Sequence, residues 1–213
     1  DAFAVDQRLG TAQADHADFT RFRNLDCHGR GPYTGYADFA TAARMKIAIT
    51  KGRGMDAIAI TRADGTRADT RLSHKGPVPH DAVHWFVERA FALERGFWGM
   101  VAGGLHPEAL QELAKAAGHA SASRAGVPDA EIVQLLQAER IVECFEADLW
   151  SGGSGAEADL LAMAATACAD SHVAMPTVPH GAVAAVREGL GRFAREWMVA
   201  GEGHVALLEW EQA

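Results

Sequence analysis

The hydrophobic pattern alternates in steps of two from Met45 onwards. Residues 46–50 and 56–61 alternate apolar and polar side chains, and a glycine-containing segment separates them. Asp64-Gly65 is a tight-turn pair, and residues 66–73 follow with little apolar content. This pattern predicts a three-stranded antiparallel meander whose third strand lies at a sheet edge.

After residue 75 the apolar positions recur at helical spacing, interrupted by glycine and proline. The predicted helices span about 79–95, 107–117, 127–149, 157–172 and 180–199. Between the first two, Gly96-Phe97-Trp98-Gly99 is typical of a buried apolar loop. Residues 204–210 predict a closing strand, which must join the first three strands because an isolated strand is unstable.

These elements predict an α+β fold. We expect a small antiparallel sheet, made of three N-terminal strands from about Met45 and one C-terminal strand, with about five helices packed on one face. Residues 1–44 show little sustained periodicity and are predicted to be an N-terminal extension. Residues 45–213 then form a single α+β domain, a size that suits one hydrophobic core.

Composition narrows the classes of partner. The net charge of −8 argues against a general nucleic-acid binder and against adhesion to anionic membranes. No apolar run reaches the roughly 18 to 20 residues that span a bilayer, and no signal-peptide pattern is visible. The three cysteines are far apart and form no C-x-x-C pair. We therefore expect a cytoplasmic protein with reduced thiols and neither a nucleic-acid nor a membrane partner.

The segment His80-Asp81-Ala82-Val83-His84 is the sequence motif that most clearly indicates a metal site. Histidines four residues apart lie on one helical face, where both rings can reach one zinc or other divalent metal ion. The spacing is that of the zinc peptidase motif H-E-x-x-H, with Asp81 in place of glutamate as the candidate catalytic carboxylate. Its side chain is one methylene shorter, which argues against an unchanged peptidase mechanism.

Further carboxylates would have to complete this site. Glu88 continues the histidine row, and it is better placed to orient His84 than to reach the same ion; we count it with Asp81 among the candidate catalytic groups. A third metal ligand must come from another element. The best sources are Glu139, Glu143 and Glu146 along one face of the long helix; Glu139 and Glu143 are favoured among them, and Glu143 is taken as the ligand. The other candidates are His106, His119, Asp170, His172 and His180.

The string Pro79 to Glu88, followed by Gly96-Phe97-Trp98-Gly99, resembles a signature of small uncharacterised bacterial proteins. Its pattern is P-H-D-x-x-H-x-x-V-E followed by G-F-W-G, and the resemblance extends loosely from Met45 to Trp210. It implies a common fold and a common site, and it brings no activity with it. The similarity to H-E-x-x-H zinc peptidases is weaker and covers five residues.

Two functional hypotheses follow from these patterns. The first is a metal-binding, hydrolase-like protein that acts on a small molecule or peptide through the His-Asp-x-x-His helix. The second is a non-enzymatic binding or assembly module, in which residues 80–84 are an ordinary helix start with structural histidines. In that case the edge strand 66–73 could pair with another chain and give a homo-oligomer.

Overall fold

The computed structural model describes residues 44–73, 76–116 and 128–211. These residues belong to one compact unit. The predicted N-terminal extension, residues 1–44, lies outside the described residues except for Arg44.

Four antiparallel strands form one sheet in the order β3-β2-β1-β4. They are β1 (Met45–Thr50), β2 (Met55–Thr61), β3 (Arg67–Ser73) and β4 (Val205–Trp210). The closing strand pairs with β1, so that Met45 lies opposite Trp210 at one end of the ladder. The predicted meander, its edge position for β3 and the returning C-terminal strand are all confirmed.

The helices lie between β3 and β4 in the chain. They are α1 (His80–Ala90), α2 (Phe97–Ala102), α3 (Pro107–Ala116), the 3-10 turn η1 (Ala130–Ile132), α4 (Val133–Trp150), α5 (Glu157–Asp170) and α6 (Ala182–Val199). The α+β class is confirmed. Within the described ranges, no helix has both the length and the apolar character required to cross a bilayer.

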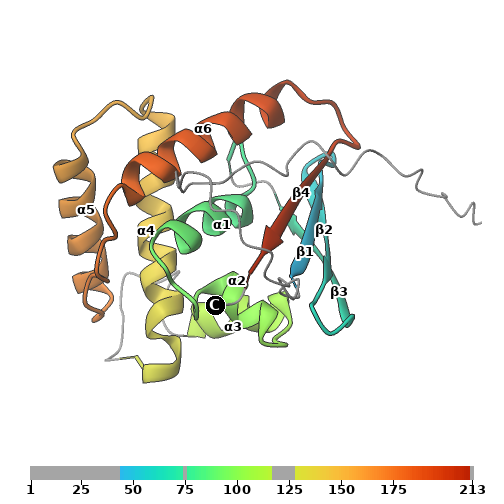
Figure 1. The fold of residues 1–213 in the computed structure, drawn as a ribbon, viewed down its shortest axis with the longest axis horizontal. Helices are drawn as coiled ribbons and strands as arrows, with labels where there is room; N and C mark the ends of the chain where they lie inside the picture. The colour runs from blue at the N-terminus through green and yellow to red at the C-terminus, as the bar shows by residue number, and fades with distance from the viewer. Residues whose placement is uncertain (1–43, 74–75, 117–127, 212–213) are drawn as a thin grey trace, which may run out of the picture. The chain divides into compact units, whose positions relative to one another are not determined.

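One face of the sheet is buried and the other is more exposed. Ile47 and Ile49 of β1 are completely buried, whereas the intervening Lys46 is exposed. The same alternation continues along β2 and β4. Figure 1 shows the helices on one side of the sheet, with α1 in contact with both α4 and α6. The core therefore lies between this sheet face and the helices, of which α2 contacts β4 and α3 contacts β3.

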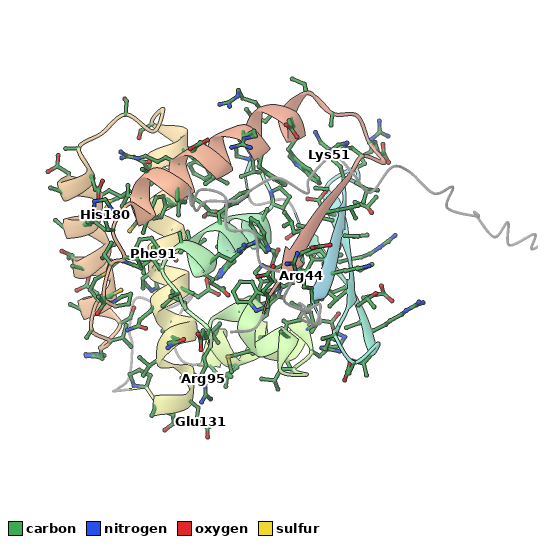
Figure 2. All side chains as sticks on the ribbon, viewed as in Figure 1. Arg44, Lys51, Phe91, Arg95, Glu131 and His180 are labelled. Carbon is green, nitrogen blue, oxygen red and sulfur yellow. The ribbon has the colours of Figure 1, made fainter. Side chains whose placement is uncertain are left out.

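Helix α1 ends five residues before the predicted boundary at about residue 95. Ala92 adopts a left-handed backbone with φ of 53°, directly after Phe91 at the end of α1 (Figure 2). The Leu93 N–H donates to the Glu88 carbonyl at 2.9 Å, and the Ala92 N–H donates to the Arg89 carbonyl at 3.4 Å. These two bonds define a Schellman ending, which usually has glycine at the left-handed position. With alanine there, the sequence gives no glycine signal for the stop.

The segment after this turn forms the short helix α2, where the sequence pattern predicted a loop. The Phe97 and Trp98 N–H groups, which a helix start leaves without intrahelical partners, donate to the Glu88 carboxylate at 2.8 and 2.9 Å. A buried carboxylate from α1 therefore stabilises the start of α2. This tertiary contact explains why local sequence pattern alone did not predict a helix.

Candidate metal centre

Two histidines at the start of α1 form the first half of the site. His80 is the first helical residue after Pro79, and His84 lies one turn further along the same face. Their Nε2 atoms are 3.2 Å apart, and their rings meet edge to face. His84 is almost fully buried, whereas the His80 side chain is 19% exposed. Pro79, the N-cap residue of α1, makes no side-chain capping hydrogen bond, and Asp81 is the acidic residue of the first turn.

Glu139 of α4 supplies the third polar atom. Its Oε2 lies 3.4 Å from the His80 Nε2 and 3.6 Å from the His84 Nε2. Ligand atoms arranged tetrahedrally around a zinc ion at about 2.05 Å lie about 3.4 Å from one another. The three separations in the structure bracket this value. His80, His84 and Glu139 could therefore hold a metal ion, and they form such a group among the described residues.

Helix geometry explains why Glu139 faces the histidines. Helix α4 packs against α1, and seven residues along a helix return to within about 20° of the starting direction. Glu146, seven residues after Glu139, accordingly reaches the His80 Nδ1 at 2.9 Å. Two turns of α4 thus present two carboxylates to the same imidazole.

Glu143 lies elsewhere, so it does not join the group in which the sequence analysis had placed it. Its direction is about 40° from Glu139 on the side opposite Glu146. Its carboxylate accepts a hydrogen bond from the Arg140 Nη1 at 2.6 Å, and its side chain is 41% exposed. Glu139, the second favoured candidate, occupies the position beside the histidines instead.

A carboxylate backs each imidazole on the side away from the centre. The His80 Nδ1 contacts Glu146, and the His84 Nδ1 contacts Glu88 at 2.8 Å. A carboxylate only accepts hydrogen bonds, so each Nδ1 carries a proton and, in a neutral ring, each Nε2 offers its lone pair. Two lone pairs and a carboxylate oxygen then converge on one point, which is an arrangement complementary to a cation. This carboxylate–histidine pairing is typical of metal centres.

In the metal-free site both imidazoles hold a second proton more tightly than an ordinary histidine does. Burial disfavours charge on His80, but hydrogen bonds with Glu139 and Glu146 outweigh it and raise the pKa of His80 to about 9. Burial likewise opposes protonation of His84, yet the charge of Glu139 raises its pKa well above the usual value. Burial opposes ionisation of Glu139, but His84 and His80 hold its pKa well below the ordinary range. When no metal is bound, the positive charge of the protonated histidines thus balances the negative charge of the surrounding carboxylates.

Asp81 and Glu88, the predicted catalytic groups, occupy different positions around the histidines. Asp81 is 6% exposed; burial raises the pKa of its carboxyl group, and the charges of His80 and His84 act in the opposite direction. Glu88 is fully buried behind His84, and burial raises its pKa against the hydrogen bond with His84. Asp81 thus follows the first histidine in the chain and interacts electrostatically with both rings. The Glu88 carboxylate instead contacts the Nδ1 of the second histidine, on the side of the ring away from the metal position.

The sequence placed Glu146 with Glu139 and Glu143 among the best sources of a third metal ligand, slightly behind those two, and did not predict its contact with the His80 Nδ1. The spacing of seven residues between Glu139 and Glu146 was the available signal, because it places both on nearly one line of a helix. The candidate ligand His119 lies outside the described residues. The remaining candidates do not join the group that the structure forms from its described residues; they are His106, Asp170, His172 and His180.

Comparison with protein-family models, with curated proteins and with solved structures finds no match to this chain. The fold and the site together define its class as an α+β protein in which two histidines and one glutamate could hold a metal ion.

Proposed function

We propose that the protein binds one divalent metal ion, of the zinc type, through the Nε2 atoms of His80 and His84 and the Oε2 atom of Glu139. The observation that carries the proposal is the triangle of these three atoms, with sides of 3.2, 3.4 and 3.6 Å. Three protein ligands leave a fourth position for water or substrate, which distinguishes catalytic zinc sites from closed structural ones.

We further propose that the site is hydrolase-like. Two histidines and one glutamate form a ligand set of catalytic zinc, and a metal in such a site acidifies bound water and polarises a carbonyl group. Asp81, next to His80 in the chain, is the candidate acceptor for the proton of that water. A small molecule or peptide would approach past the His80 and Glu146 side chains, which are 19% and 18% exposed.

Metal binding is tested on protein purified without a polyhistidine tag. Elemental analysis and calorimetric titration with zinc should give one ion per chain for the wild type, and His84→Ala should lose it. His180→Ala is the matched control, because His180 is exposed in the turn before α6 (Figure 2) and should leave zinc binding unchanged. Absence of stoichiometric metal, or equal binding by the His84→Ala variant, overturns the proposal.

The hydrolytic part is tested with the zinc-loaded protein and a panel of activated esters and short peptides. Asp81→Asn should keep the metal and lower turnover about 10²- to 10⁴-fold, which is the usual contribution of a positioned proton acceptor. If the zinc-loaded wild type turns over none of these substrates, the hydrolase-like function is contradicted and a non-enzymatic binding module is favoured. Metal binding itself would then stand.

A further inference from the structure

We propose that Glu88 is a positioning residue that holds His84 with its Nδ1 protonated and its Nε2 directed at the metal position, and so sets the metal affinity of the site. The inference rests on the proposed metal binding and deepens it. It assigns the control of affinity to a carboxylate that touches neither the ion nor a substrate.

Three nitrogen atoms surround the Glu88 carboxylate. Its Oε1 lies 2.8 Å from the His84 Nδ1 and accepts from the Phe97 N–H at 2.8 Å, and its Oε2 accepts from the Trp98 N–H at 2.9 Å. Both backbone groups can only donate, so the carboxylate is fixed as an acceptor at both oxygens. The proton of this hydrogen bond therefore belongs to the His84 Nδ1, which leaves the Nε2 for the metal.

The chain around Glu88 is built to keep the carboxylate in this place. A Cβ atom on Gly96 would lie 2.5 Å from the Glu88 Cδ, so only glycine allows the backbone to approach this closely. The Trp98 Nε1 donates to the Asp81 carbonyl at 2.8 Å and ties α2 to the first turn of α1. The Phe97 ring centre lies 5.6 Å from that of His84. Helix α2 thus limits rotation of both the carboxylate and the imidazole.

Glu146 makes the same kind of contact to His80, but in a different environment. Its side chain is 18% exposed and that of His80 is 19% exposed, whereas Glu88 and His84 are 0% and 1% exposed. Water can replace a lost partner at His80, and it has little access to His84. Glu88 and Glu146 are therefore a matched pair, and replacing each by glutamine should lower zinc affinity more at Glu88 than at Glu146.

Glu88→Gln is the direct test. The amide has one acceptor oxygen, so its NH₂ group must either face the Trp98 N–H and lose that bond, or face the His84 Nδ1 and force the proton onto Nε2. We expect zinc affinity to fall about 10- to 100-fold, the usual range for such supporting groups. Glu146→Gln should lower it less than tenfold. Equal losses in the two variants, or wild-type affinity in Glu88→Gln, overturn the inference.

A measurement on the wild type covers the case in which Glu88→Gln fails to fold. Nitrogen-15 NMR of histidine-labelled protein should show a slowly exchanging, strongly downfield His84 Nδ1–H signal, both without metal and with zinc bound. An unprotonated His84 Nδ1 overturns the positioning role. A wild type that binds no zinc fails the proposed function, whereas a wild type that binds zinc with an unprotonated His84 Nδ1 fails the role of Glu88 alone, so the two failures are distinguishable.

Discussion

At the scale of single residues, the candidate centre is a balance between carboxylates and imidazoles. The His80 ring contacts Glu139 and Glu146, and the His84 ring contacts Glu139 and Glu88. Without metal, protons on both rings offset these negative charges. A divalent ion can take over that role only if it displaces those protons, so protons and metal compete for the same nitrogen atoms.

Zinc affinity should therefore rise with pH. Because the pKa of His80 is raised to about 9 and that of His84 lies well above 6.5, both rings are largely protonated in the metal-free protein at pH 6 to 7. Raising the pH weakens this competition, and affinity should increase by up to about tenfold per pH unit for each proton displaced. Calorimetry in buffers of different ionisation enthalpy measures the released protons. Affinity that is constant between pH 6 and 8 contradicts the balance.

Residue-scale prediction from the sequence succeeded for the histidine pair and was incomplete for its partners. The i, i+4 spacing of His80 and His84 fixes their common face within one helix. The choice between Glu139 and Glu143 depends on how α4 is rotated against α1, and on the Arg140 that attracts Glu143. No local pattern contains that rotation.

At the scale of elements, tertiary hydrogen bonds decide where the elements around the site begin and end. Alternation and turn residues were sufficient to predict the four strands and most helices. The early end of α1 and the start of α2 depend instead on the Schellman turn at Ala92 and on Glu88. Both features shape the segment behind His84, so the elements least predictable from sequence are those that support the candidate site.

Ala92→Gly should stabilise the protein. A left-handed alanine costs roughly 1–2 kcal/mol, and glycine removes this cost while losing more entropy on folding. We expect a net increase of about 0.5–1 kcal/mol in the free energy of unfolding, measured by urea denaturation. Ala90→Gly, in the last turn of α1, is the control and should lower stability by about 0.5–1 kcal/mol. A stability loss in Ala92→Gly contradicts the assigned turn.

At the scale of the whole described domain, α1 packs against α4 and α6, and its Trp85 donates a hydrogen bond to the Glu209 carbonyl of β4. It carries the histidines on the side of α4 and places Phe86 against α6. At that contact a Cβ on Gly189 would lie 2.8 Å from two atoms of the Phe86 ring. The approach of α6 to α1 therefore requires glycine at position 189, and the position of α1 depends on packing on both sides.

Gly189→Ala should lower stability by about 1–2 kcal/mol, because overpacking outweighs the helix propensity gained from alanine. Gly191→Ala in the same helix is the matched control. Its Cβ would meet only the flexible end of Arg195 at 3.6 Å, so a gain of about 0.5–1 kcal/mol is expected. Thermal and urea unfolding of both variants measure the difference. Equal behaviour of the two would show that Phe86 does not limit the approach of α6.

The central claim is that His80, His84 and Glu139 bind one metal ion, and a crystal structure of the zinc-loaded protein tests it most directly. An anomalous difference map at the zinc absorption edge should show one peak about 2 Å from the Nε2 atoms of both histidines and from a Glu139 oxygen. Glu143→Gln crystals should keep this peak, and Glu139→Gln crystals should lose it. A peak elsewhere, or no peak beside His80 and His84 in fully zinc-loaded crystals, would contradict the account.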